Sequence, residues 1–155
     1  VYKRQGQAAE EGSSPRFLVS ALRDPEGANL DRVQVVKLWV DAESGAPRER
    51  IFDVAVSDGR QIGADGRCRE SVGSSVDVDA ATYSNTIGDA ALATVWRDPE
   101  FDPRMPALYY VRVLEIPTPR WTTYDAARFG TERPPGAPAT LQQRAYTSPI
   151  WYTPE

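Results

Sequence analysis

Apolar and polar residues alternate in several short stretches of this chain, a pattern typical of half-buried β-strands. In residues 16–22 the apolar side chains Phe17, Val19 and Ala21 fall on one side. Residues 32–40 are rich in β-branched residues and partly apolar on both faces, which predicts a central strand. Further strands are expected at 50–56, 75–83, 107–116 and 150–152. Residues 90–96 fit a short strand or one helical turn, and the strand is favoured.

The segments between these stretches carry turn and loop signals. Residues 1–14 are polar and small and are expected to form a flexible lead-in to one domain over 15–155. Residues 58–73 hold several glycines and many charges, which predicts a long exposed loop. Residues 117–148 are expected to be irregular, because repeated prolines exclude a long regular element. Those prolines are Pro117, Pro119, Pro134, Pro135 and Pro138.

About seven short strands with turns between them, and no long amphipathic helix, predict an all-β fold. The expected form is an antiparallel, immunoglobulin-like β-sandwich with long Pro-rich loops. Tyr109 lies two residues before Val111, which is the spacing of a tyrosine corner, with Val111 where an antibody domain has a cysteine. The acidic residue usual in that motif is absent at Met105.

Composition narrows the function classes. A chain of 155 residues suffices for one domain with a core, and no apolar run approaches a membrane span of roughly 20 residues. The net charge of −4 makes nucleic acid a poor partner. Cys68 is the only cysteine, which excludes an intrachain disulfide. The chain begins at Val1 without Met or a signal-type stretch, so it is expected to be a fragment of a longer protein.

Candidate catalytic groups are sparse, because the chain contains no histidine, the commonest transition-metal ligand and general base. Without histidine to activate it, Cys68 is not expected to be a nucleophile. Glu115, near Arg112, and Asp125 are read as salt-bridging to Arg112, Arg120 or Arg144 rather than as an acid/base pair. No catalytic residue and no metal ligand is assigned. Solvated loops are favoured over a calcium site for Asp77, Asp79, Asp89, Asp98, Glu100 and Asp102.

The aromatic residues divide into two groups. Trp39 and Tyr109 lie on expected core strands. Trp121, Trp151 and Tyr152 lie near Pro-rich segments, where a domain–domain interface is favoured, with core packing and ligand contact as alternatives.

An ordered set of motifs gives the chain a family resemblance over roughly residues 15–154. The motifs are WRDPEFDP at 96–103, ALYYVRVLE at 107–115, PTPRW at 117–121 and QQRAYTSPIWY at 142–152, with supporting matches at 17–19, 24–25, 29–37 and 85–88. The chain is similar to the C-terminal part of the family called domain of unknown function 3604. That family resembles the PHP-type (polymerase and histidinol phosphatase) metal-dependent hydrolases, whose His/Asp-rich N-terminal domain holds metals that activate water.

The resemblance implies a non-catalytic C-terminal β domain of a larger PHP-like hydrolase. Its partner is then the N-terminal catalytic domain of the same protein, which holds the divalent metal, and this chain needs no cofactor. Residues 117–152 are expected to clamp the sandwich against that domain, bordering its active-site mouth. The interface or substrate-mouth candidates are Arg112, Glu115, Arg120, Trp121, Arg144, Ser148 and Trp151.

Two alternatives are a carbohydrate- or small-ligand-binding β-sandwich module and a complete small enzyme acting through Asp, Glu and Arg alone. The first needs a contiguous aromatic patch on one face. The second needs two convergent carboxylates in a pocket.

Overall fold

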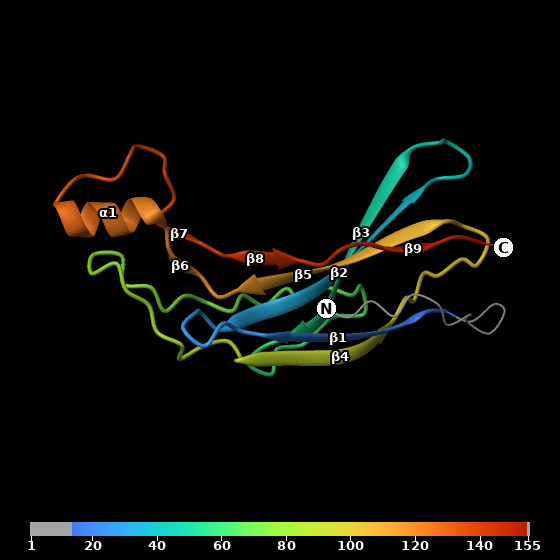
Figure 1. Ribbon diagram of the computed structural model, residues 1–155, viewed down its shortest axis with the longest axis horizontal. Coiled ribbons are helices and arrows are strands. Elements are labelled where there is room, and N and C mark those ends of the chain that lie inside the picture. Colours follow the sequence, from blue (N-terminus) through green and yellow to red (C-terminus); the bar gives the residue numbers. More distant parts are fainter. Residues whose placement is uncertain (1–13, 155) are drawn as a thin grey trace.

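The computed structural model describes residues 14–154, in which nine strands and one helix are formed (Figure 1). All but the last residue of the expected lead-in, 1–14, lies outside the described residues. The elements are β1 (Arg16–Leu22), β2 (Leu30–Val40), β3 (Pro47–Val56), β4 (Ala91–Arg97), β5 (Ala107–Glu115), β6 (Thr118–Pro119), α1 (Trp121–Phe129), β7 (Thr140–Leu141), β8 (Arg144–Tyr146) and β9 (Ile150–Tyr152).

The larger sheet has the order β3-β2-β5-β8, and all its pairs are antiparallel. As predicted from its apolar faces, β2 is central, between β3 and β5. The free edge of β5 pairs with β8 through Arg112↔Tyr146 and with β9 through Leu108↔Trp151. Strands β1 and β4 form a separate antiparallel ladder that lies beneath β2 and β5 in Figure 1.

The core lies between the ladder and the larger sheet. Val33 and Val35 of β2 and Tyr109 of β5 are at most 1% exposed and cluster with Val19 of β1 and Leu92 of β4. The expected apolar side of β1 faces this core, since Val19 belongs to the cluster and Phe17 and Ala21 pack against it. The chain is therefore an antiparallel, all-β, sandwich-like domain, as the alternation pattern predicted.

Two stretches differ from their predictions. The strand expected at 75–83 is wrong: the segment is a tight turn bridged by Asp77 and Thr82. The Asp77 carboxylate accepts the backbone N–H of Asp79 and of Ala80, and such side-chain capping favours a turn over a strand. Ala81 has a φ of 51°, which a strand excludes.

Helix α1 is the element that periodicity did not indicate within 117–148. It starts directly after Arg120 and ends at Gly130, which adopts the left-handed conformation with φ 65°. The helix is held to the returning chain, because Ala139 O accepts the Arg120 N–H at 2.9 Å and the Thr123 hydroxyl at 2.7 Å. Figure 1 shows α1, β6 and β7 at one end of the molecule, beyond the two layers.

The tyrosine corner predicted at Tyr109 is wrong in its hydrogen bond. The Tyr109 hydroxyl donates to the Asp98 carboxylate at 2.7 Å rather than to a backbone carbonyl. Asp98 is also not the solvated loop residue that was expected. It is 2% exposed and forms an ion pair with Lys37, whose Nζ lies 2.6 Å from Asp98 Oδ2.

Gly88 is expected to tolerate no side chain. It has a φ of +73°, and a Cβ there would lie 2.6 Å from Ile116 Cγ2 and 2.9 Å from Leu30 O. We expect Gly88→Ala to lower the free energy of unfolding by about 2–3 kcal/mol, because overpacking adds to left-handed strain. Gly73→Ala is the matched control, since Gly73 has a φ of +81° but no atom within 4 Å of a Cβ. Urea denaturation measures both variants. Equal losses in their free energy of unfolding would contradict the predicted clash at Gly88.

Candidate functional site

The side of the larger sheet that faces away from the β1–β4 ladder carries many of the candidate residues. Side chains of directly paired residues share a face, and those next to core residues along a strand point the opposite way. Tyr109 and Val111 face the core, so Tyr110 and Arg112 face outward. We call this the outer face; it comprises Leu38, Leu108, Tyr110, Arg112, Leu114, Arg144, Tyr146 and Trp151.

Aromatic side chains are prominent on the outer face. Trp151 is 70% exposed and Tyr146 is 56% exposed. The rings of Tyr110 and Tyr146 pack with centroids 6.2 Å apart, and the Arg112 Nε–H donates to Gln34 Oε1 at 2.7 Å. The face thus presents aromatic rings on a sheet whose polar centre is fixed by hydrogen bonds.

The structure brings some of the predicted site residues together and separates others. Arg112, Arg144 and Trp151 lie on the outer face, and exposed Ser148 lies between β8 and β9. Arg120 and Trp121 lie at the start of α1 instead. Because α1 follows the end of β5 while β9 pairs with its beginning, Trp121 and Trp151 lie toward opposite ends of the molecule (Figure 1). They therefore form no contiguous patch.

Glu115, the remaining candidate, closes β5 and is half-buried. Its backbone carbonyl accepts Gln142 Nε2 at 2.8 Å, and its N–H donates to Gln143 O at 3.0 Å. The expected ion pair with Arg112, Arg120 or Arg144 is wrong: within residues 14–154 the Glu115 carboxylate joins no salt bridge. Asp125 joins none there either.

Burial raises the pKa of Glu115, and the negative charge of Asp24 adds to the rise. The folded state therefore penalises the charged form, and stability is lost as pH rises from the unfolded-state pKa through the raised folded-state pKa. We expect Glu115→Gln to gain stability relative to the parent over that window and to keep the gain at neutral pH. Urea denaturation from pH 3 to 8 measures the difference in free energy of unfolding between Glu115→Gln and the parent. A gain that does not depend on pH would contradict the raised pKa of Glu115.

A second candidate surface adjoins the start of α1. A pocket of about 380 Å³, which we call the helix-end pocket, is lined by Pro119, Arg120, Trp121, Tyr124, Leu141 and Gln143. Trp121 is 63% exposed, and Arg120 is half-buried, with a buried Nε that has no hydrogen-bond partner. The pocket thus combines an apolar wall with an unsatisfied cationic donor.

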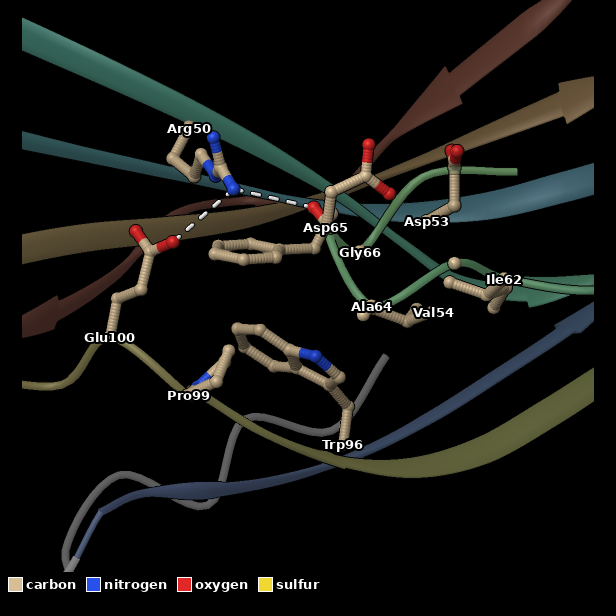
Figure 2. A pocket seen from close by; sticks show the side chains of 12 residues that line it. Arg50, Asp53, Val54, Ile62, Ala64, Asp65, Gly66, Trp96, Pro99 and Glu100 are labelled. Carbon is tan, nitrogen blue, oxygen red and sulfur yellow. Dashed lines mark hydrogen bonds and ion pairs between the residues drawn. The ribbon is translucent and has the colours of Figure 1, made fainter. Parts of the chain in front are cut away.

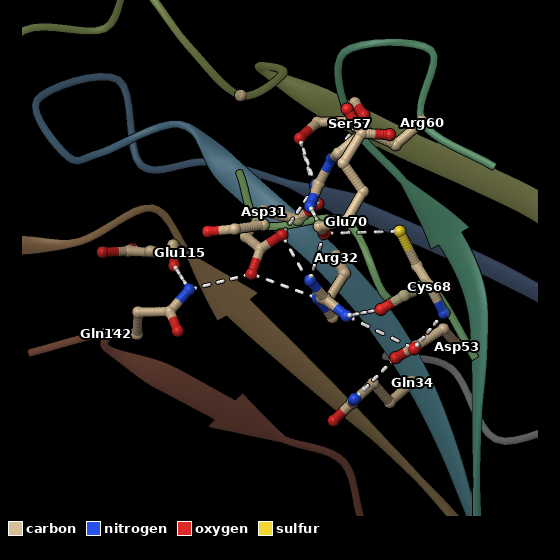
Figure 3. A network of polar contacts seen from close by, with 12 residues as sticks. Asp31, Arg32, Gln34, Asp53, Ser57, Arg60, Cys68, Glu70, Glu115 and Gln142 are labelled. Atoms are coloured by element: carbon tan, nitrogen blue, oxygen red, sulfur yellow. Dashed lines mark hydrogen bonds and ion pairs between the residues drawn. The ribbon is translucent and has the colours of Figure 1, made fainter. Parts of the chain in front are cut away.

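Two buried carboxylates organise the polar network in Figure 3. Asp31 accepts hydrogen bonds from Arg60 at 2.6 Å and from Gln142 at 2.8 Å, and it also pairs with Arg32. Burial lowers the pKa of Arg32, but the hydrogen bond to Asp31 and the negative charges of Asp31 and Asp53 together outweigh burial, so the pKa of Arg32 is raised. Because Gln142 reaches Asp31 from the C-terminal segment, the network fixes that segment to β2.

Asp53 anchors the loop that follows β3. Its carboxylate accepts Gln34 Nε2 at 2.6 Å and the Cys68 N–H at 2.8 Å, and it pairs with Arg32 (Figure 3). The loop expected to be exposed at 58–73 is indeed irregular, but Arg60 and Cys68 within it are buried. Local composition did not predict the burial of Arg60 and Cys68, because their partners Asp31 and Asp53 are distant in the sequence. With every carboxylate oxygen paired, the network is structural.

A third feature is an interlayer cavity of about 300 Å³ between β3, the loop after it and the chain around Trp96 (Figure 2). Phe52 and Trp96 pack with ring centroids 5.1 Å apart. Arg50 crosses the opening, pairing with Glu100 at 3.3 Å and donating to Asp65 O at 3.3 Å. Sequence analysis did not anticipate this cavity, because its walls come from three separate segments.

Residues 14–154 hold neither a metal-binding cluster nor a membrane-spanning helix. No group of three or more Cys, Asp or Glu side chains there is arranged to hold a metal ion. The helix formed in that range, α1, is not long and apolar enough to cross a membrane.

The fold and the exposed outer face define an all-β, sandwich-like domain with an outward-facing aromatic and arginine surface. The chain belongs to the family described as "Protein of unknown function (DUF3604)", whose profile matches residues 5–154. This confirms the resemblance to that family read from the ordered motifs, whereas the relation to PHP-type hydrolases stays a prediction. Comparison with curated proteins and with solved structures found no match.

Proposed function

We propose that this chain is a non-catalytic accessory β domain of a larger PHP-like metal-dependent hydrolase. It packs its outer face and the start of α1 against the N-terminal catalytic domain, which holds the divalent metal. The observation that carries the proposal is the exposure of Trp121, Tyr146 and Trp151. Within residues 14–154 the candidate arginines Arg112, Arg120 and Arg144 join no salt bridge. Buried Trp, Tyr and Arg side chains supply most of the binding energy of protein interfaces.

The arrangement of these residues favours a protein partner over solvent. Trp151 and Tyr146 stand on the outer face next to half-buried Leu108 and Tyr110, so an apolar patch surrounds them. Large exposed apolar patches rimmed by polar residues are typical of interaction surfaces. Arg144, exposed on β8, supplies such a rim. The surface therefore has the composition of an interface, an aromatic centre with a charged edge.

The same surface is held rigidly, which lowers the entropic cost of docking. Tyr146 is paired to Arg112 in the sheet, and Thr147 Oγ1 accepts the Val111 N–H at 3.0 Å. The Tyr152 hydroxyl donates to Pro103 O at 2.9 Å, which fixes the strand that carries Trp151. Both ends of the β8–β9 segment are thus fixed before any partner binds.

Truncation of Trp151 is expected to weaken association with the catalytic domain. Trp151→Ala should raise the Kd by about 30-fold, which corresponds to about 2 kcal/mol for an interface anchor. Isothermal titration of the chain with the separately produced catalytic domain measures this. The control is Leu18→Ala, because Leu18 is 79% exposed on the other layer. If Leu18→Ala weakened binding as much as Trp151→Ala, the docking face would be wrongly assigned.

A second candidate function, binding of a carbohydrate or other small ligand, is favoured by the interlayer cavity. Trp96 lines this cavity with Arg50 and Glu100, so a ring and hydrogen-bonding groups lie close together (Figure 2). NMR titration with neutral oligosaccharides tests it. Saturable shifts of the Trp96 indole N–H that vanish in Arg50→Ala would support this function, and their absence would reject it.

A further inference from the structure

We infer that the helix-end pocket is a receptor for a carboxylate, supplied by a glutamate or aspartate side chain of the catalytic domain. The inference rests on the proposed function and deepens it, because it names the chemistry of one anchor in the interface. It is carried by Arg120 and by the surroundings that the fold gives this residue.

Arg120 has no anionic partner among the described residues. Its Nε is buried and has no hydrogen-bond partner, and within residues 14–154 its guanidinium joins no salt bridge. It is also the only charged residue among those that line the pocket. Buried donors in proteins are nearly always satisfied, so an unsatisfied guanidinium donor at the wall of a pocket indicates a missing acceptor.

The start of α1 adds to the positive potential at this place. Arg120 is the N-cap residue and makes no side-chain capping bond, and the first turn holds no acidic residue. The N-terminal end of a helix favours anions through its free N–H groups and its dipole. In the same turn the Thr122 hydroxyl is also buried without a partner, and Thr122 is only 6% exposed. Two buried side-chain atoms without a partner, Arg120 Nε and Thr122 Oγ1, therefore lie at the start of α1, and Arg120 is the one whose residue lines the pocket.

The remaining walls select the form of the anion. Pro119, Leu141 and the rings of Trp121 and Tyr124 are apolar, while Gln143 supplies an amide. A carboxylate on a short methylene stem fits this combination, since the stem packs on the rings and the carboxylate meets the guanidinium. A planar carboxylate also matches the forked geometry of arginine.

The position of the pocket identifies the source as a protein side chain. Figure 1 places α1 at the end of the molecule, beyond the two layers, where a neighbouring domain has access. Trp121, 63% exposed, stands at the pocket wall and is itself an interface candidate. A side chain inserted from the docked domain would cover Trp121 and satisfy Arg120 together.

The direct test is NMR of the Arg120 Nε–Hε group in the full 155-residue chain. The probes are N-acetyl-glutamate methylamide and its glutamine counterpart, at equal ionic strength. We expect a saturable shift with the glutamate probe and an affinity at least ten-fold weaker with the glutamine probe. Arg120→Gln should abolish the binding, and Arg16→Gln, exposed on β1 of the other layer, should leave it unchanged. Equal response to both probes, or none to either, would overturn the inference.

A second measurement separates this inference from the proposed function. The affinity for the catalytic domain is measured for the parent chain, Arg120→Gln and the control Arg16→Gln at low and high salt. We expect Arg120→Gln to lose at least ten-fold in affinity and much of the salt dependence, since a charge pair is removed. Docking that is indifferent to Arg120→Gln would reject the carboxylate receptor alone. Saturable glutamate binding without docking would retain the carboxylate site and reject the partner domain as its source.

Discussion

Lys37→Met is expected to lower the free energy of unfolding by about 3–5 kcal/mol, because it leaves a buried carboxylate without its counter-ion. The side chains of Lys37 and Asp98 are 2% and 0% exposed, and Lys37 Nζ also donates to Glu100 O at 2.6 Å. After the substitution Asp98 keeps only its neutral donors, including the Tyr109 hydroxyl. Burial and the neighbouring Asp98 both raise the pKa of Tyr109, so that hydroxyl stays protonated and continues to donate. Urea denaturation measures the loss.

The matched control for Lys37→Met is Arg104→Met. Arg104 pairs with Asp102 at 3.0 Å, a distance like that of the buried pair, but its side chain is 87% exposed. Exposed pairs contribute about 0–1 kcal/mol, so Arg104→Met should be nearly neutral. A similar loss in both variants would show that burial of the Lys37–Asp98 pair does not govern its contribution.

The second large effect is expected for Asp31→Asn. The change keeps the shape of the side chain but removes the charge that pairs with Arg60 and Arg32, whose guanidinium groups are largely buried. We expect a loss of about 3–5 kcal/mol, as for other broken buried ion pairs. Since Gln142 also donates to Asp31, hydrogen exchange should accelerate at the Glu115 amide, which donates to the neighbouring Gln143 O.

Asp65→Asn is the control for this network. Asp65 pairs with Arg69 at 2.6 Å, but the arginine side chain is 82% exposed. We expect Asp65→Asn to change stability by less than about 1 kcal/mol and to leave exchange at Glu115 unchanged. Unaltered exchange at Glu115 in Asp31→Asn would mean that the network does not hold the C-terminal segment.

The strands were predictable because their signals are local. In β1 the alternation of Phe17, Val19 and Ala21 directly marks the core side. The apolar faces of residues 32–40 likewise predicted the central position of β2. The strand wrongly expected at 75–83 had the same alternation, but Asp77 captures two backbone N–H groups and closes a turn. Alternation alone does not show that a side chain competes with strand pairing for these backbone N–H groups.

The buried charges were not predictable from local sequence. Lys37 and Asp98 are 61 residues apart, and the antiparallel pairing of β2 with β5 and the packing of β4 bring them together. Asp98 was expected to be solvated, because charged residues in loops usually are. Helix α1 was not predicted for a different reason. The prolines on both sides of it predicted an irregular segment, although the stretch between Arg120 and Gly130 contains none.

The exposure of several candidate residues could be predicted from the sequence, whereas their role in an interface stays a prediction. The aromatic and arginine residues of 117–152 were singled out for the interface, and the structure places several of them on the surface. What the sequence lacked was their arrangement. Trp151 belongs to the outer face, whereas Arg120 and Trp121 line a pocket with Leu141 and Gln143 that forms only because β6 pairs with β7.

The most direct test of the accessory-domain account is hydrogen–deuterium exchange of this chain alone and within the longer protein. The account predicts that the longer protein slows exchange around Trp121, Tyr146 and Trp151. It predicts no change in β1 and β4, whose outward side lies on the other layer. Protection confined to β1 and β4, or identical exchange in the two states, would contradict docking through the outer face and the helix-end pocket.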